Sequence, residues 1–541
     1  MQKKLSVDNL FKLGLLSFHQ LGHGPTGRPT QEQTDMTSRT WSQQQEAIFG
    51  WFAGRQNGHL VVRARAGTGK STTIREGVKR APEASILIAA FSKALQEDMA
   101  AQIGSFAGKV QTLHAVGYAC VRRFRDHIKV AFNSDRADRL ALAACGSTAP
   151  DAILRLVAKL HTKGREVAPH AARMGDLAAI QITFECEPEE QWAAAGFDNA
   201  YVEQKALDAM RLAAEVKSGD TIDGSDMIFL PVRNGWMTRQ FDLVVVDEAQ
   251  DMTAAQLEIA LGVLKAGGRI CIVGDDCQAI FAFRGADSGS LDRLKAELQA
   301  AELGLTTTYR CGKAIVALAQ AYVPDFEAGA GNPEGVVRTL GIDAEGKTTG
   351  ETLVEAAGPG DFILSRVNAP LVSIAMQLLR AGKRTRVAGR DIGKGLITLV
   401  RKLKARSVPD LLGKLEAWAG REVARHEAQL AKALNGRQSA LKAKIEAVQD
   451  QLEMLASLAD GAKGVNEVEA RIEALFTDDG LGQAGVITCS SVHRSKGLEA
   501  ERVFVLRDTL RETNQEEKNI AYVAITRAKR ELVWCSKEQA S

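Results

Sequence analysis

The sequence predicts an α/β protein built on parallel sheets, and three observations carry that prediction. Short apolar runs alternate with helical stretches in two separate parts of the chain, as in strands joined by crossover helices. A glycine-containing loop at residues 64–73 directly follows the apolar run 60–62. The strongest strand pattern, Phe241–Val246, ends in Asp247 and Glu248, where an α/β sheet presents its active-site edge.

The loop at residues 64–73 has the phosphate-binding P-loop pattern, except that Ala64 stands where the strict form has glycine. Gly67 and Gly69 let the backbone approach a phosphate and direct its N–H groups toward it. Lys70 is expected to contact the β- and γ-phosphates and Ser71 to bind Mg²⁺, at the start of a helix that favours anions. The other residues expected to line the nucleotide here are Ala66, Thr68 and Thr72. A chance glycine loop is the simpler alternative, but strand, loop and helix occur in the required order.

The bulk composition is that of an ordinary globular protein, with 45% hydrophobic and 25% charged residues among 541. At about 150 residues per domain, this length predicts three or four domains. The net charge of +3 is mildly basic, so a nucleic-acid groove would need local clustering of basic side chains. No apolar run approaches the roughly 20 residues of a membrane span. Lys12 interrupts the apolar stretch near the start, which argues against a signal peptide.

The eight cysteines form no C-x-x-C pair, and several lie in apolar strand-like runs, including Cys271, Cys489 and Cys535. Reduced, buried thiols are therefore expected, and a zinc or iron–sulfur site is poorly supported. Free thiols and the lack of a membrane segment together predict a cytoplasmic protein.

A helical stretch interrupts each of the two α/β regions. The first carries basic residues such as Arg122, which either contact phosphate or form a solvated helix face. The second has apolar residues at helical spacing, as at Ile445, Val448 and Leu452, and predicts a helical hairpin or small bundle with a turn at Gly436. The predicted organisation is a mobile leader at 1–39, a first core at 40–115 and 236–300, a helical insert at 116–235, a second core at 301–395 and 484–541, and a coiled-coil-like helical insert at 396–483.

Two further groups of residues are candidates, one for catalysis and one for nucleic-acid binding. Asp247 is expected to hold Mg²⁺, and Glu248 to orient and deprotonate the attacking water. Adjacent acids at a strand end are common, but a P-loop upstream in the same sheet favours this role. Farther along, Phe281 and Phe283 lie beside Arg284. The rings could stack on bases while the arginine holds phosphate, with a pair of core phenylalanines as the alternative.

Taken in order over residues 40–530, these blocks resemble a superfamily 1 DNA helicase of the UvrD/Rep/PcrA type. The matching motifs are the P-loop, whose family form also lacks the first glycine, the Asp-Glu-Ala-Gln-Asp box at 247–251, Tyr309-Arg310, the His-x-x-Lys-Gly-Leu-Glu box at 493–499, and Ile-Thr-Arg-Ala around Arg527. The resemblance implies two RecA-like cores that hold ATP and Mg²⁺ between them. It does not cover the leader or either insert.

The resemblance also implies roles for single residues at the nucleotide. They are Gln44 and Tyr309 at the adenine, Glu499 at the ribose, Gln278 as the sensor that links the γ-phosphate to DNA, and Arg310 and Arg527 as arginines that reach the γ-phosphate from the second core. Neutralising charge on a transferring phosphoryl group is worth several orders of magnitude in rate in related systems.

A second set of residues is implied to contact single-stranded DNA. These residues are Phe91, Ser92, Thr112, His114, Phe281, Phe283, Arg284, His493 and Lys496. At 281 and 283 the family commonly has Tyr and Trp, and phenylalanine keeps the stacking face, worth about 1–3 kcal/mol per base.

The implied activity is a DNA-stimulated ATPase that moves 3′ to 5′ on single-stranded DNA and separates strands. Because the insert at 396–483 is smaller than the family's usual accessory domain, translocation is implied more strongly than unwinding. The alternatives are a motor that strips proteins from DNA or remodels junctions, an ATP-switched binding module in a repair, recombination or phage-related complex, and action on RNA. Expected partners are single-stranded DNA, DNA junctions, and repair or replication proteins bound through the inserts. A fused nuclease is not supported, because no unassigned acid cluster lies outside the ATP site.

Overall fold

The computed structural model of the chain describes residues 40–54, 58–132, 135–280, 290–342, 350–431, 435–477 and 485–536. Two compact units make up the chain, residues 1–43 and residues 44–541. Both large sheets belong to the second unit. The leader predicted at 1–39 lies outside the described residues.

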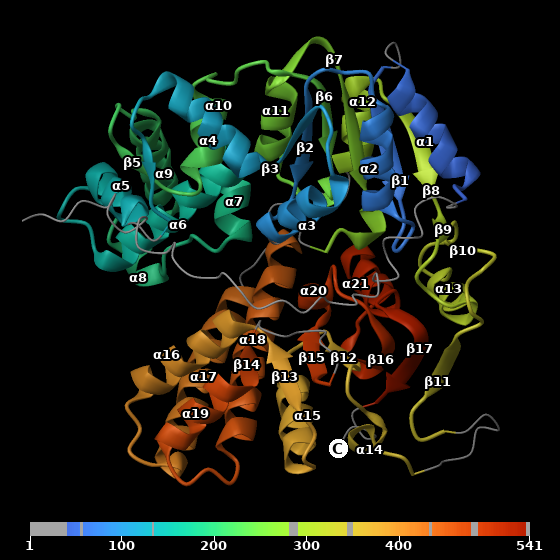
Figure 1. Cartoon of the computed structure of the whole chain (residues 1–541). Coiled ribbons are helices and arrows are strands. Elements are labelled where there is room, and N and C mark those ends of the chain that lie inside the picture. The colour runs from blue at the N-terminus through green and yellow to red at the C-terminus, as the bar shows by residue number, and fades with distance from the viewer. Residues whose placement is uncertain are drawn as a thin grey trace, which may run out of the picture. The chain divides into compact units, whose positions relative to one another are not determined.

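The first core is a six-stranded parallel sheet in the order β3-β2-β6-β7-β1-β8 (Figure 1). Its strands are β1 (Leu60–Ala64), β2 (Ile86–Ala90), β3 (Gly108–Thr112), β6 (Phe241–Val246), β7 (Leu264–Gly274) and β8 (Ala301–Leu305). Its helices are α1 (Gln43–Ala53), α2 (Lys70–Arg80), α3 (Lys93–Ile103), α11 (Ala254–Gly262) and α12 (Ser290–Leu298). The interior strand β2 is buried along its whole length, as expected for a parallel sheet covered on both faces.

All strands of this sheet point the same way, so their carboxyl ends share one edge. The P-loop follows β1 there, and Asp247 and Glu248 follow β6. The register pairs Ile88 of β2 with Val245 of β6, and Val61 of β1 with Ile272 of β7. The predicted parallel α/β class is confirmed.

The first core extends past the boundary predicted at residue 300. The strand β8 pairs in parallel with β1, from Leu60 opposite Ala301 to Ala64 opposite Leu305. Its sequence, Ala-Glu-Leu-Gly-Leu, has only two large apolar residues, because β8 is an edge strand. The crossover to the second core therefore begins after residue 305.

A helical insert separates β3 from β6. Its elements are α4 (Leu113–Phe124), β4 (Lys129–Val130), α5 (Arg136–Cys145), α6 (Asp151–Val167), α7 (Ala178–Thr183), α8 (Glu190–Ala194), α9 (Asn199–Ala214), β5 (Thr221–Ile222) and α10 (Asp226–Arg233). An apolar cluster that includes Ile153, Val157 and Phe229 lies inside this insert. The fully buried Arg165 pairs with Asp226 at 2.6 Å, which offsets the cost of burying its charge.

The second core is a seven-stranded parallel sheet in the order β11-β17-β16-β12-β15-β13-β14. Its strands are β11 (Val336–Thr339), β12 (Phe362–Ser365), β13 (Thr385–Ala388), β14 (Phe476–Thr477), β15 (Ile487–Ser491), β16 (Ala500–Leu506) and β17 (Ala528–Cys535). Its helices are α13 (Lys313–Ala319), α14 (Leu353–Ala356), α15 (Ala369–Arg380), α20 (Val492–Ser495) and α21 (Gln515–Ile525), and a small pair, β9 (Thr307–Thr308) with β10 (Glu327–Ala328), precedes the sheet.

The second insert consists of α16 (Arg390–Leu403), α17 (Val408–Ala431), α18 (Asn435–Ala459) and α19 (Val465–Leu475). The turn predicted at Gly436 is wrong, because this residue lies in the first turn of α18. One continuous apolar cluster joins the insert to the second sheet and contains both Leu455 and Phe504. In addition, the Asp450 carboxylate of α18 accepts the N–H of Ala369 at 2.5 Å at the start of α15. The second insert and the second core therefore pack as one body.

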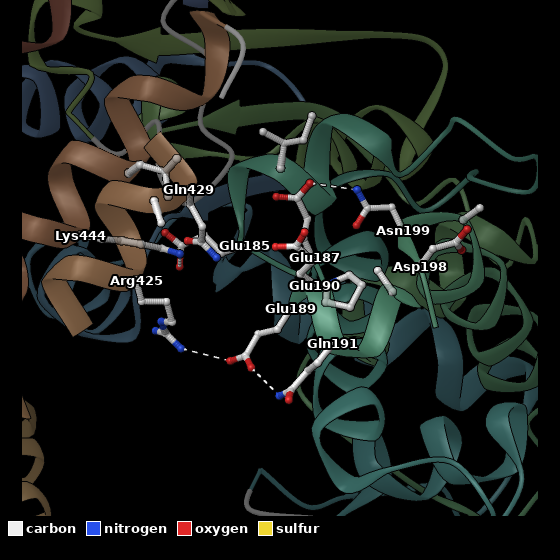
Figure 2. Close-up of a pocket in the computed structure, with 16 residues that line it drawn as sticks. Glu185, Glu187, Glu189, Glu190, Gln191, Asp198, Asn199, Arg425, Gln429 and Lys444 are labelled. Atoms are coloured by element: carbon white, nitrogen blue, oxygen red, sulfur yellow. Dashed lines mark hydrogen bonds and ion pairs between the residues drawn. The ribbon is translucent and has the colours of Figure 1, made fainter. Parts of the chain in front are cut away.

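A cavity of about 930 Å³ lies between the two inserts, away from the P-loop (Figure 2). The wall from the first insert carries Glu185, Glu187, Glu189, Glu190 and Asp198. The opposite wall, from α17 and α18, carries two cations that form ion pairs across the cavity. Lys444 lies 2.9 Å from Glu185, and Arg425 lies 3.4 Å from Glu189. The cavity contains none of the predicted site residues.

Two simple properties complete the fold. The described helices include none that is both long and apolar enough to cross a lipid bilayer. All eight cysteines are free thiols, and most of them are buried.

Candidate active site

The P-loop joins β1 to α2, and hydrogen bonds fix its backbone. The N–H of Arg65 donates to a carbonyl of β8 at 2.8 Å, and the Thr68 hydroxyl donates to the Arg65 carbonyl at 2.9 Å. Gly67 and Gly69 have φ angles of 68° and 82°, in the left-handed region that glycine adopts at least cost. The loop therefore turns tightly and leaves the start of α2, at Lys70, on the carboxyl edge of the sheet.

Lys70 and the two acids after β6 form a charged cluster. The Lys70 ammonium lies 3.3 Å from the Glu248 carboxylate. Burial opposes the charge of Lys70, but the carboxylates of Glu248 and Asp275 raise its pKa above the ordinary value. Burial would also raise the pKa of Glu248, but Lys70 and Lys496 lower it. Both members of the Lys70–Glu248 pair are therefore charged, and Glu248 is available to accept a proton.

Asp247 has a different environment from its neighbour. Burial and the negative charge of Glu248 raise the pKa of Asp247. One of its oxygens accepts the N–H of Glu248 at 2.9 Å, and its side chain has no carboxylate–cation pair among the described residues. A carboxylate in this position is stabilised by a bound cation, and oxygen ligands are those that Mg²⁺ prefers. Asp247 and the exposed Ser71 hydroxyl thus fit a Mg²⁺ ion held with the phosphates.

Gln278 lies where the two cores meet. Its amide donates to the Asp275 carboxylate at 2.5 Å, and its carbonyl oxygen lies 3.5 Å from a guanidinium nitrogen of Arg527. The Lys496 ammonium donates to the backbone carbonyl of Gln278 at 2.6 Å. Two cations of the second core, Lys496 and Arg527, therefore contact Gln278 of the first core.

Arg527 is buried, and its guanidinium donates to the carbonyls of Val523 and Leu498 at 3.0 Å and 3.1 Å. Within the described ranges, no carboxylate forms an ion pair with it. Burial and the nearby charge of Arg310 lower the pKa of Arg527 to about 10. A buried cation without a matching anion is well suited to receive a phosphate group.

Arg310 and Tyr309 lie directly against the P-loop. The Tyr309 N–H donates to the Gly67 carbonyl at 2.9 Å, and a side-chain carbon added to Gly67 would lie 2.5 Å from Cβ of Arg310. The Arg310 side chain pairs with Glu499 at 2.6 Å. The Tyr309 side chain is 49% exposed, so its ring is free to receive a planar group.

Gln44, predicted at the adenine, reaches the crossover after β8. Its amide donates to the Thr306 hydroxyl at 2.8 Å, and its carbonyl oxygen accepts the Thr306 N–H at 3.0 Å. The next residue, Gln45, donates to the Thr73 hydroxyl of α2 at 3.1 Å. Gln45 therefore contacts the helix that follows the P-loop, and Gln44 contacts the crossover segment after β8.

Comparison with known families agrees with this arrangement. The model of the UvrD/REP helicase N-terminal domain matches residues 42–299, and that of the UvrD-like helicase C-terminal domain matches residues 486–534. Together the two matches span more than half of the chain. The chain belongs to the UvrD/Rep helicase family.

Relatives of this UvrD/Rep-family chain include F-box DNA helicase protein 1 of Schizosaccharomyces pombe, 24% identical over 537 residues, which covers 88% of this chain and 55% of the yeast protein. The ATP-dependent DNA helicase PcrA of Bacillus subtilis is 23% identical over 298 residues, 50% of this chain and 38% of PcrA. The ATP-dependent DNA helicase Rep of Escherichia coli is 31% identical over 107 residues, 18% of this chain and 16% of Rep. The chain thus spans about half the length of the yeast relative. The matched regions cover smaller shares of PcrA and Rep.

Several residues predicted to contact DNA in this UvrD/Rep-family chain also have structural roles. The Ser92 hydroxyl caps α3 by accepting the Leu95 N–H at 3.3 Å, and the Thr112 hydroxyl caps α4 at 3.2 Å. Phe91 is partly buried and packs against the apolar cluster of the first core. Burial lowers the pKa of His114, so its ring is neutral at neutral pH.

The remaining predicted DNA residues fall into two groups. Phe281, Phe283 and Arg284 lie outside the described residues. His493 is half-buried on α20, and Lys496 is engaged with the Asp251 carboxylate at 2.7 Å as well as with the carbonyl of Gln278. Lys496 thus links the second core to the first.

Two residues at the site were not predicted from the sequence. The Tyr522 hydroxyl of α21 accepts the Ala66 N–H of the P-loop at 3.0 Å. The Asn519 amide, one turn earlier on α21, donates to the carbonyls of Asp276 and Ala279 at 3.1 Å and 3.0 Å. Spacing along the chain gives no signal for either contact, because each joins residues hundreds of positions apart.

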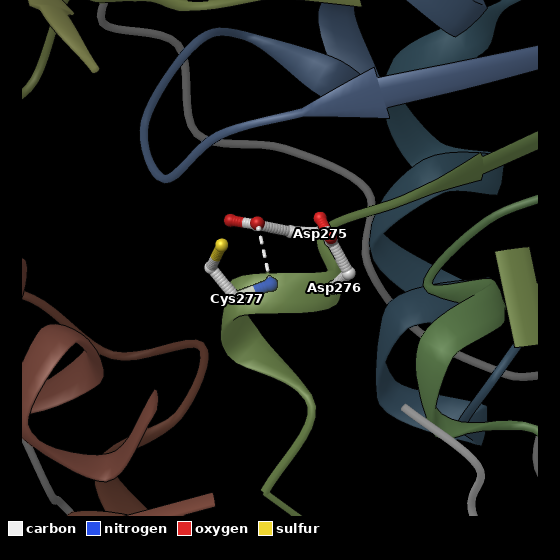
Figure 3. A group of neighbouring side chains, drawn as sticks. All are labelled: Asp275, Asp276 and Cys277. Carbon is white, nitrogen blue, oxygen red and sulfur yellow. Dashed lines mark hydrogen bonds between the residues drawn. The ribbon is translucent and has the colours of Figure 1, made fainter. Parts of the chain in front are cut away.

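Asp275, Asp276 and Cys277 bring two carboxylates and a thiol within 4.8 Å of one another (Figure 3). The Arg65 guanidinium already occupies the space they share, at 2.7 Å from Asp276 and 3.3 Å from both Asp275 and Cys277. The group therefore serves as the counter-charge of a buried arginine.

Proposed function

We propose that this chain is an ATP-driven motor that moves 3′ to 5′ on single-stranded DNA and separates strands ahead of it. The observation that carries the proposal is the contact of Arg310 with Gly67 of the P-loop and of Arg527 with Gln278, each of which brings an arginine of the second core to the first core. Family membership supports it, since the related PcrA and Rep proteins are named ATP-dependent DNA helicases.

In the proposed cycle, Lys70 binds the phosphates of ATP, while Ser71 and Asp247 hold Mg²⁺. Glu248 orients the attacking water and takes its proton. Arg310 and Arg527 stabilise the charge that develops on the γ-phosphoryl group. Since both arginines belong to the second core, hydrolysis weakens one of the attractions that hold the cores together.

The DNA strand is proposed to cross both cores near Phe91, His114 and His493, with Phe281 and Phe283 as stacking platforms. Gln278 connects this path to the nucleotide, because its segment leads into residue 281 and its side chain lies beside Arg527. Repeated closing and opening of the cores would then move the protein along the strand.

A strand-displacement assay with tailed duplexes tests the proposal. We expect ATP-dependent unwinding of 3′-tailed DNA, little unwinding of 5′-tailed DNA, and loss of the activity in Glu248→Gln. Preference for the 5′ tail would overturn the polarity. A preference for an RNA strand would overturn the proposed substrate, and ATP hydrolysis that is indifferent to DNA would favour an ATP-switched binding module.

A second candidate, translocation that strips proteins from DNA with little unwinding, is favoured by one observation. The space between the two inserts is lined on one side by five carboxylates, of which two pair with Lys444 and Arg425, and the remaining net negative charge repels a DNA backbone. Removal of streptavidin from biotinylated single-stranded DNA, without displacement of a complementary strand, would identify this activity.

A further inference from the structure

The P-loop of this chain contains an arginine, Arg65, whose side chain contacts acids of both cores. Arg65 stands between the end of β1 and Gly67, and only 7% of its surface is exposed. The lysine of the loop, Lys70, already faces the acids after β6. The guanidinium of Arg65 instead lies among carboxylates from both cores.

On the first-core side, Arg65 shares a carboxylate with the proposed γ-phosphate sensor. Its Nη1 atom lies 3.3 Å from one oxygen of Asp275, while the other oxygen of Asp275 accepts the amide of Gln278 at 2.5 Å. The same nitrogen donates to Asp276 at 2.7 Å. A shift of the Arg65 guanidinium would therefore move the anchor that sets the direction of the Gln278 side chain.

On the second-core side, Arg65 is held by two parallel hydrogen bonds. Its Nε and Nη2 atoms donate to the two carboxylate oxygens of Asp325 at 3.0 Å and 2.9 Å, the bidentate geometry that gives an arginine–carboxylate pair its direction. Asp325 lies between α13 and β10, and its neighbours Val323 and Phe326 belong to the apolar cluster of the second core.

The two sides of this contact differ in burial. The Asp275 side chain is fully buried, whereas the Asp325 side chain is 47% exposed. An exposed carboxylate keeps part of its hydration, so separating it from Arg65 costs far less than separating a buried one. The contact with Asp325 is thus the one that would open first if the cores separated.

We propose that Arg65 is a positioning residue that couples the approach of the second core, through Asp325, to the orientation of Gln278, through Asp275. This inference rests on the proposed function, because it assigns a route by which the position of the second core reaches the γ-phosphate sensor. A purely structural role would instead make the Arg65–Asp325 pair a contributor to stability alone.

The variant Asp325→Asn tests the coupling, since it removes the charge of Asp325 and leaves the contacts of Arg65 with Asp275 and Asp276 in place. We expect the stimulation of kcat by single-stranded DNA to fall about fivefold or more, a typical lower value for coupling between sites. The KM for ATP and the basal kcat should stay within about twofold, because Asp325 pairs with Arg65 and, among the described residues, makes no hydrogen bond to Lys70 or Glu248. Asp325→Glu, which keeps the charge, should restore the stimulation.

The matched control is Asp292→Asn. Asp292 pairs at 2.6 Å with Arg63, which lies on β1 two residues before Arg65, and the Asp292 side chain is 74% exposed. Its loss should leave kcat, KM and DNA stimulation unchanged. A second variant, Arg65→Lys, keeps a charge beside Asp275 but loses the bidentate pair, and should reduce the stimulation of kcat by single-stranded DNA as Asp325→Asn does.

Three results would count against these conclusions, and they are distinguishable. Full DNA stimulation in both Asp325→Asn and Arg65→Lys would overturn the coupling while leaving the proposed motor intact. Equal losses in Asp325→Asn and in the Asp292→Asn control would likewise overturn it. Absence of DNA-stimulated hydrolysis in the unchanged chain would overturn the proposed function, and with it the coupling.

Discussion

The ammonium of Lys70 lies 3.3 Å from the carboxylate of Glu248, although 178 residues separate them in the chain. The contact places the proposed phosphate-binding cation beside the proposed general base. Bound phosphates would compete with Glu248 for Lys70, which would release the carboxylate to act on water.

Glu248→Gln should therefore bind ATP and fail to hydrolyse it. An amide cannot accept a proton from water, and general bases contribute about a hundredfold or more to rate. Phosphate release and binding of a fluorescent ATP analogue measure the two properties separately. Glu302→Gln is the matched control, because Glu302 pairs with Arg63 outside the site. Hydrolysis by Glu248→Gln at the rate of this control would contradict the assignment.

Arg527→Lys should reduce kcat strongly and alter ATP affinity little. Lysine keeps the charge but cannot donate at once to the Val523 carbonyl, the Leu498 carbonyl and a phosphate. We expect kcat to fall by about a thousandfold, as for other arginines that stabilise phosphoryl transfer. Arg502→Lys serves as the control, since Arg502 pairs with Asp361 inside the second core. If both variants have the same kcat, Arg527 does not act on the nucleotide.

Gly67→Ala should damage the site without unfolding the chain. The added carbon would lie 2.5 Å from Cβ of Arg310, at a φ of +68° that disfavours alanine. Either the P-loop or Arg310 must shift, so we expect ATP affinity to fall about tenfold, the equivalent of about 1.4 kcal/mol. Titration with a fluorescent ATP analogue measures this loss. Gly50→Ala is the control, because Gly50 lies on α1 with open space around it. Unchanged affinity in Gly67→Ala would show that the loop relaxes freely.

The buried His161 should make the chain less stable below neutral pH. Burial, and next the charge of Arg165, lower the pKa of His161 from 6.5 to about 4. Because the unfolded chain takes up this proton first, stability is lost as the pH falls from about 6.5 toward 4. This lowering of the His161 pKa corresponds to a loss of at most about 3 to 4 kcal/mol of stability.

Melting temperatures of the full chain between pH 7 and pH 4.5 measure this effect, with His161→Gln as the comparison. The variant should lose less stability over this range than the unchanged chain. Parallel curves for the two proteins would show that His161 is not the group responsible.

The interior strands could be predicted from sequence because each is a continuous apolar run. Phe241–Val246 is the best case, since a strand covered on both faces needs apolar side chains at every position. The edge strand Ala301–Leu305 could not be predicted in this way, because its exposed side tolerates Ala and Glu. For the same reason the sequence predicts an end of the first core at residue 300, before this strand.

The residues of the nucleotide site also separate into those that the sequence predicts and those that it does not. The P-loop and the acids at 247–248 follow from local spacing, and the family resemblance identified Arg310 and Arg527. Neither source pointed to the contacts of Tyr522 or Asp325. Each of these joins the P-loop to a residue far along the chain, and a contact of that kind depends on how the two sheets pack and leaves no pattern in the sequence.

The two inserts differ in a way that bears on how such chains can be recombined. The first has an apolar cluster of its own, but Leu113 of α4 and Ile228 of α10 also belong to the cluster of the first core, so an exchange between relatives must keep these two helices. The second shares one cluster with the strands that it interrupts, and Leu455 packs within the same group as Phe504. Deleting it would expose the inside of the second core, so a chimaera that carries a foreign second insert should fold only if the sheet beneath is transferred with it.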